Sequence, residues 1–217
     1  MTKIFLPDYP ENDLFTTAFS THANKPGFFP GTGGFFHGHP TTAARFAFFG
    51  TDFGPIDYQK TLGDSGERED QRTICALRSI TTEAGIDLND CHLTNAVLCL
   101  RKGTSATSKF PIWKIYSDYV EMCATWHRDR LKERKTRAVV LMGLPHLHSF
   151  GALLFPELAI EWQGLKTLKS VYCAGKEKIV LHSGINVLLM HHPSFWHAYP
   201  SCFKVRAVSH LRSLINA

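Results

Sequence analysis

The sequence lacks the long apolar runs of a membrane protein. None of its hydrophobic stretches approaches the roughly 20 consecutive apolar residues that a membrane-spanning helix needs. The first ten residues, MTKIFLPDYP, also lack the apolar centre of a signal peptide. Because neither signal is found, we expect a cytoplasmic protein that does not associate with membranes.

Closely paired cysteines are missing as well. The chain has six cysteines in 217 residues, none of them spaced as Cys-x-x-Cys, and a chain of this length buries a core without disulfide bonds. His-x-His pairs occur at His37–His39 and His146–His148, but a zinc site needs further ligands, and no cysteine pairs accompany them. We therefore expect reduced thiols, no bound metal and no cofactor.

Three common catalytic or nucleotide-binding motifs are also absent. The sequence contains no Gly-x-Gly-x-x-Gly after its first apolar run, no Gly-x-x-x-x-Gly-Lys-Ser/Thr and no Gly-x-Ser-x-Gly, which argues against a dinucleotide, a P-loop nucleotide and a serine-elbow hydrolase. The composition, with 44% hydrophobic residues and a net charge of +5, is that of a globular protein whose mild positive excess permits an anionic partner.

What the sequence does contain is an alternation of apolar runs and helical patterns. Strands are predicted at 45–50, 91–100, 137–143 and 184–194, and helices at 66–86, 111–135, 145–162 with a break near Pro156, and 202–217. Continuous apolar strands separated by helices are typical of a parallel sheet covered on both faces. We predict an α/β fold: a three-layer α/β/α sandwich with a central, mainly parallel four-stranded sheet. The whole chain, 1–217, is expected to form one domain, over which the Gly-, Pro- and Phe-rich residues 1–43 wrap as loops.

Polar residues follow the predicted strands where each one ends. The four strand ends carry Gly50–Gly54, Thr94–Asn95, Gly143–His146 and His191–Ser194. In parallel sheets ligands bind outside the carboxyl ends of the strands, so these residues are expected to meet at one edge. A carboxamide there matches the donor and acceptor edge of a pyrimidine, and a carboxylate can orient water or stabilise positive charge on a sugar.

Four short motifs at these ends, FFGTDFG, LTNAVLCLRKG, VVLMG and HHPSFW, occur in the order of the motifs of a known superfamily. Over residues 45–200 the chain resembles the uracil-DNA glycosylase superfamily, with features of its family-1 and family-4 enzymes. The resemblance implies a monofunctional DNA glycosylase of base-excision repair, which we expect to bind DNA as a monomer. Such an enzyme flips a uracil-like or deaminated base out of the DNA and hydrolyses its N-glycosidic bond with activated water.

The resemblance also implies roles for individual residues. Asp52 would position the water and stabilise the sugar cation, Asn95 would hydrogen-bond the flipped base, and His192 would contact the carbonyl of the leaving base. The remaining base-binding positions would be Gly50, Thr51, Phe53 and Gly54. The DNA-binding positions would be Ser194 at a phosphate, Phe195 or Trp196 as the wedge that fills the emptied stack, and Arg101 and Lys102 at the start of a polar loop.

The chain departs from the superfamily pattern at three places. Phe53 replaces the usual Pro, and Gly54 stands where family-1 enzymes carry a Tyr that excludes 5-methyl groups, so the pocket is expected to accept 5-substituted pyrimidines. Cys99 and Cys123 match two of the four family-4 iron–sulfur ligands. The other two should precede the first motif, but the first cysteine of the chain is Cys75, so we expect no cluster.

Several alternatives remain open at this point. Asp52 could be a turn residue, because Asp before Gly and Pro is ordinary turn chemistry, and Asp57 is a rival carboxylate. Asn95 could only brace neighbouring loops, and strand alternation brings only one of His191 and His192 inward. A catalytically silent relative that binds nucleic acid, and a small-molecule hydrolase on a similar frame, are the alternative functions. The excised base and the preference for single- or double-stranded DNA stay undetermined.

Overall fold

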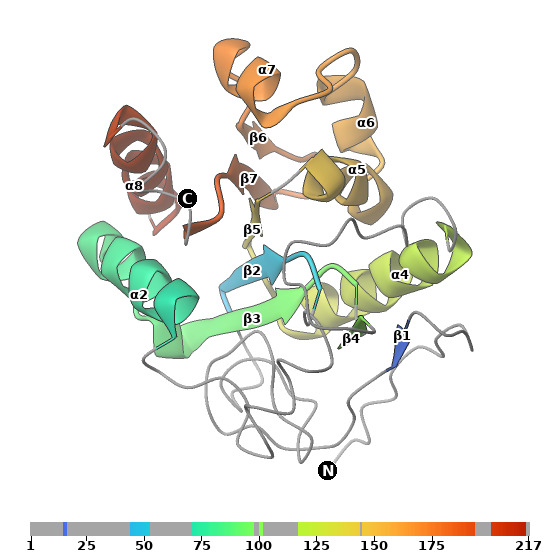
Figure 1. Ribbon diagram of the computed structural model, residues 1–217, viewed down its shortest axis with the longest axis horizontal. Helices are drawn as coiled ribbons and strands as arrows, with labels where there is room; N and C mark the ends of the chain where they lie inside the picture. Colours follow the sequence, from blue (N-terminus) through green and yellow to red (C-terminus); the bar gives the residue numbers. More distant parts are fainter. Residues whose placement is uncertain are drawn as a thin grey trace.

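A five-stranded sheet lies at the centre of the computed structural model, which describes residues 15–16, 44–52, 71–97, 100–101, 117–143, 145–193 and 201–215 (Figure 1). The strand order is β3-β2-β5-β7-β6. Four strands run parallel, namely β2 (Phe46–Gly50), β3 (Cys91–Asn95), β5 (Ala138–Met142) and β7 (Asn186–Met190). These four are the strands that the apolar runs predict, and every residue in them is buried.

The fifth strand corrects the prediction of four. Strand β6 (Lys178–Val180) pairs antiparallel with β7 at the edge of the sheet, and its three residues are too few and too exposed to form a recognisable pattern. The predicted strand 91–100 is also too long. It ends at Asn95, and β4 (Leu100–Arg101) pairs instead with β1 (Phe15–Thr16) in a separate two-stranded sheet.

The helices match the predicted ranges to within one residue at their starts or lie inside them. Two elements were not predicted, the helix α7 and a 3-10 turn. They are α2 (Arg72–Ala84), α4 (Ser117–Glu133), α5 (Pro145–Leu154), α6 (Glu157–Glu161), α7 (Leu168–Cys173) and α8 (Ser201–Ile215), with a 3-10 turn η2 (Leu88–Asp90). Gly85 ends α2 with a φ of 84°, a left-handed conformation that glycine adopts without strain. The break near Pro156 is confirmed, because α5 and α6 meet there. Helix α7 was not predicted; Thr167 and Ser170 begin it with a capping box.

Two hydrophobic cores, one on each face of the sheet, make the molecule a three-layer sandwich. Successive strand residues point to opposite faces, so Phe48 packs with α2 and α8, while Phe49 packs with α4 and α5. Figure 1 shows α2 and α8 on one side of the strands and α4 and α5 on the other. The predicted α/β/α architecture is therefore confirmed. No helix within the described ranges is long and apolar enough to cross a membrane.

Candidate functional site

The carboxyl ends of β2 and β3 lie side by side and stay joined beyond the strands. Gly50 pairs in register with Asn95. Past this pair, the backbone N–H of Ala96 donates to the carbonyl of Gly50 at 2.8 Å, and Val97 donates to Thr51 at 3.0 Å. The ladder therefore brings the chain before Asp52 against the chain after Asn95. Asp52 is half-buried there, and the Asn95 side chain is only 2% exposed.

A histidine from α4 anchors the end of β3. The Nε2 atom of His127 lies 2.9 Å from the backbone carbonyl oxygen of Asn95. A carbonyl only accepts hydrogen bonds, so Nε2 carries the proton and donates. The ring is fully buried and packs edge-on against Phe49 and Trp126, with centroid distances of 4.9 and 5.0 Å. His127 thus holds the backbone at the position that carries the Asn95 carboxamide.

His127 was not among the predicted site residues, although the sequence held a signal for it. The buried positions of α4 recur at helical spacing, at Val120, Cys123, Ala124 and Leu131, and residue 127 falls on the same stripe. A histidine at a core position needs a polar partner. The backbone carbonyl at the end of a neighbouring strand can supply one, as that of Asn95 does.

The two neighbouring histidines after β7 have different surroundings. His191 is 8% exposed, and its ring packs against Tyr172 of α7 and Phe203 of α8, at centroid distances of 5.5 and 5.0 Å. The side chain of Tyr172 also hydrogen-bonds the backbone of His191. His192 is half-buried, and burial lowers its pKa to about 4, so its imidazole is neutral at pH 7. His191 thus packs among aromatic rings of α7 and α8, and burial lowers its pKa below the usual value as well.

The ends of β5 and β7 are joined in the same way as those of β2 and β3. The backbone N–H of Gly143 donates to the carbonyl of Met190 at 2.9 Å. Gly143 has a φ of 124°, which residues with a side chain rarely adopt. Turning there allows the chain to leave β5 while remaining bound to β7.

Three helices come directly after a parallel strand of the sheet in the order of elements, namely α2 after β2, α5 after β5 and α8 after β7. The N-terminus of a helix carries a partial positive charge that acidic residues in the first turn usually offset. The first turns of α2, α5 and α8 contain no acidic residue, whereas that of α4 contains Asp118. A helix N-terminus without an acidic residue in its first turn can accept an anionic group, and α2, α5 and α8 are of this kind within the described residues.

Some predicted site residues cannot be placed at this edge. Phe53, Gly54, Lys102, Ser194, Phe195 and Trp196 lie outside the described residues, as do Asp57 and Cys99. The backbone of Arg101 lies in β4, paired with Phe15 of β1. Cys123 lies on the buried face of α4, in the hydrophobic core. Within the described part of the chain, no three His, Cys, Asp or Glu side chains are grouped so as to hold a metal ion.

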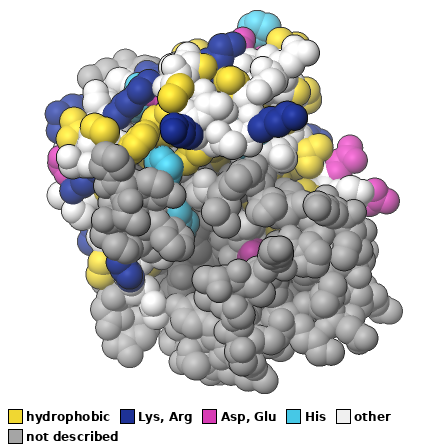
Figure 2. Space-filling model, turned by 45° about the horizontal axis from the view of Figure 1, so that its top comes forward, with side chains coloured by type: hydrophobic (Ala, Val, Ile, Leu, Met, Phe, Trp, Pro, Cys, Tyr) yellow, Lys and Arg dark blue, Asp and Glu magenta, His cyan; other side chains and the backbone are white. Residues whose placement is uncertain are grey.

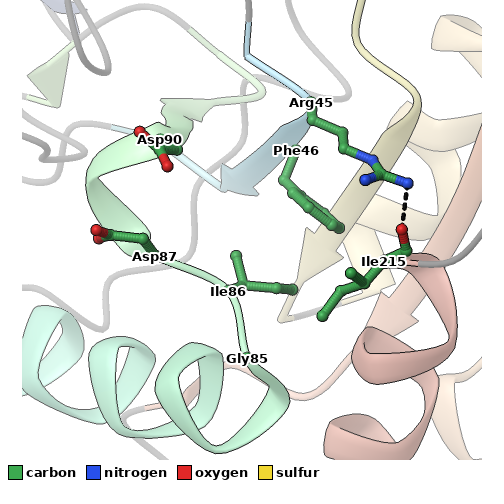
Figure 3. A pocket seen from close by; sticks show the side chains of 7 residues that line it. All are labelled: Arg45, Phe46, Gly85, Ile86, Asp87, Asp90 and Ile215. Atoms are coloured by element: carbon green, nitrogen blue, oxygen red, sulfur yellow. Dashed lines mark hydrogen bonds between the residues drawn. The ribbon is translucent and has the colours of Figure 1, made fainter.

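A hollow of about 370 Å³ lies at the opposite, amino edge of the sheet, between the ends of α2 and α8 (Figure 3). Phe46 and Ile86 supply apolar lining, and Asp87 stands on one side. Arg45 turns toward the end of α8, where it donates to the carbonyl of Ile215. The basic group of this hollow is thus engaged in holding two elements together.

Comparison of the chain with protein-family models and with curated proteins finds no match. Function is therefore inferred from the residues at the carboxyl edge.

Proposed function

We propose that the protein is a monofunctional DNA glycosylase that hydrolyses the N-glycosidic bond of a flipped, uracil-like or deaminated base. The observation that carries the proposal is the backbone ladder from Gly50–Asn95 to Thr51–Val97. This ladder brings a carboxylate-bearing loop and a carboxamide-bearing loop to one edge. A base-excision site needs both groups, one at the sugar and one at the base.

The chemistry assigns one role to each side chain. The Asn95 carboxamide hydrogen-bonds the polar edge of the extruded base. As the bond between the base nitrogen and C1′ breaks, Asp52 stabilises the positive charge on the sugar and orients water for attack at C1′. The water proton passes to Asp52, and the base leaves as an anion that then takes a proton from solvent.

His192 supports this assignment through its charge state. The low pKa of His192, about 4, keeps the ring neutral at pH 7. A neutral imidazole can donate one hydrogen bond to the base carbonyl, which becomes negative as the base leaves. A protonated ring at the same position would be destabilised by its burial.

The positive helix ends support DNA as the ligand. The first turns of α2, α5 and α8, which follow β2, β5 and β7, contain no acidic residue. Phosphates next to the flipped nucleotide would gain from the partial positive charge of these helix ends. No lysine is assigned to the sugar, so the reaction is expected to stop at the abasic product without strand cleavage.

The test is a base-release assay on oligonucleotides, single- and double-stranded. They carry uracil, hypoxanthine, xanthine, mismatched thymine or 5-hydroxymethyluracil. The wild type is compared with Asp52→Asn and with Asp87→Asn, the same change at the amino edge. We expect release of at least one base, a loss of orders of magnitude for Asp52→Asn, and no loss for Asp87→Asn. Equal activity of the Asp52→Asn variant and the wild type would refute the assignment. No release from any substrate would favour a silent DNA-binding relative or a small-molecule hydrolase.

A further inference from the structure

Positive charge is concentrated in the last quarter of the chain. Residues 162–217 contain seven Lys or Arg and one acidic residue, Glu177, whereas residues 1–161 contain 17 Lys or Arg and 18 Asp or Glu. The net charge of +5 therefore comes from the segment that forms α7, β6, β7 and α8.

The single carboxylate of this segment does not reach solvent. Glu177 is 1% exposed, and its Oε1 atom accepts from Nε2 of His210 at 2.9 Å and pairs with Nε of Arg206. Glu177 is thus paired with Arg206 and His210, and not with the lysines of this segment.

Two lysines of the segment are available to a ligand. Lys176 and Lys204 form ion pairs with Glu161 and Glu83, both at 3.2 Å. Lys166 and Lys169 are exposed and have no ion-pair partner among the described residues. They lie before and within α7.

The basic segment adjoins the proposed site. Tyr172 of α7 and Phe203 of α8 pack against each other and against His191 at the end of β7. The guanidinium of Arg206 lies 5.4 Å from the centre of the Tyr172 ring. Figure 2 shows Lys and Arg side chains spread over the described part of this face, with few Asp or Glu among them. A molecule bound at the carboxyl edge can therefore continue onto α7 and α8.

We propose that the face that carries Lys166 and Lys169, before and within α7, binds the phosphate backbone of nucleic acid that extends from the carboxyl edge. This inference rests on the proposed function only for its choice of ligand. Exposed lysines that are not paired with a carboxylate of the described residues suit a polyanion with regularly spaced charges. An anionic membrane fits less well, because it would need an apolar anchor. Among the described residues, the exposed large hydrophobic side chains lie singly on four different elements: Leu153, Ile160, Val180 and Val205.

The experiment compares two double variants with equal charge changes. Lys166→Ala/Lys169→Ala removes two charges from the α7 face, and Lys132→Ala/Arg137→Ala removes two exposed charges from the end of α4 and the start of β5, at the amino edge. Affinity for a uracil-containing duplex is measured against salt concentration. If both lysines contact phosphates, the slope of log affinity against log salt becomes shallower by about 1.8 for the first variant. The second variant should keep the wild-type slope, and base release at saturating DNA should be unchanged in both.

Equal changes in slope for the two variants would overturn the inference, because only net charge would then matter. Absence of duplex binding by the wild type would also overturn it. Vesicles containing phosphatidylserine form a second arm. Loss of vesicle binding by the α7 variant, with duplex binding equal to that of the control variant, would assign the face to a membrane instead. A wild type that binds DNA with the lysine-dependent slope but releases no base would refute only the proposed function.

Discussion

At the amino edge of the sheet, side-chain hydrogen bonds join elements that are distant in sequence. At the carboxyl edge, hydrogen bonds to the backbone hold strand ends whose side chains are partly exposed. At the amino edge, Arg45 donates to the last carbonyls of α8, and Thr136 donates through its hydroxyl to the carbonyl of Ala44 at 2.9 Å. These groups are engaged in the fold itself.

The carboxyl edge uses the backbone for the same purpose. Backbone hydrogen bonds join the strand ends in pairs, and His127 fixes the carbonyl of Asn95. Asp52 and His192 are then left half-buried at the ends of their strands. On the proposed function, stability and chemistry are divided between the two edges, so substitutions at the two edges should have different consequences.

The largest expected effect separates two adjacent residues at the carboxyl edge. His192→Phe removes the hydrogen-bond donor assigned to the leaving base, and single-turnover base release should fall about 100- to 1,000-fold. His191→Phe makes the same substitution in the aromatic cluster with Tyr172 and Phe203. Packing of similar volume is largely kept there, so activity should stay within about tenfold. A larger loss for His191→Phe than for His192→Phe would exchange their roles.

A second prediction concerns stability at low pH. Burial lowers the pKa of His192 from 6.5 to about 4, so the folded protein resists its protonation more than the unfolded chain does. The contribution of the neutral ring is complete above pH 6.5 and is lost as the pH falls toward 4, by at most about 3 kcal/mol. Urea unfolding at pH 7 and pH 4 should show a smaller loss of stability for His192→Phe than for the wild type. His182→Asn, at a side chain that is 97% exposed, should behave as the wild type. An identical loss in all three proteins would contradict the assignment.

The parts of the fold that sequence predicted are those with a local cause. Runs of apolar residues predicted the four parallel strands, and Pro156 predicted the break between α5 and α6. Strand β6 has no such cause. It is only three residues long, and it forms because β7 offers it a free edge. Its pairing is a tertiary effect that a window of sequence does not contain.

The candidate site divides in the same way. The order of strands and the polar residues at their ends placed Asp52 and Asn95 at one edge from sequence. The choice between His191 and His192 depended on Tyr172, which lies on a helix that the sequence analysis did not predict. Likewise, the role of His127 depends on a contact across 32 residues. Side-chain orientation at the strand ends was therefore set by packing partners outside the motifs.

A third prediction tests the anchor beneath Asn95. His127→Phe keeps an aromatic ring but leaves the carbonyl of Asn95 without its donor, and unfolding free energy should fall by about 2 kcal/mol. His127→Gln places an amide N–H near the position of Nε2 and should recover part of this loss. If His127 acts through Asn95, base release should fall less when His127→Phe is made in an Asn95→Ala background than in the wild type. Simple additivity in that double-mutant cycle would leave His127 with a role in stability alone.

The smallest expected effect is at the amino edge. Arg45 joins the start of β2 to α8 through the carbonyls of Leu214 and Ile215. Its charge also lies at a helix C-terminus, where the macrodipole favours a cation. Arg45→Met keeps much of the aliphatic stem but removes both interactions, and because water can reach the freed carbonyls, the cost should be only about 1 kcal/mol. Arg45→Lys retains the charge without the planar fork, and its stability should fall between that of Arg45→Met and that of the wild type.

Base release at saturating DNA should be unchanged in both variants, because the sheet separates this edge from Asp52 and His192. Thermal unfolding combined with single-turnover release checks both statements. Loss of activity in Arg45→Met at full stability would show that the two edges are coupled and would contradict the division of roles between them.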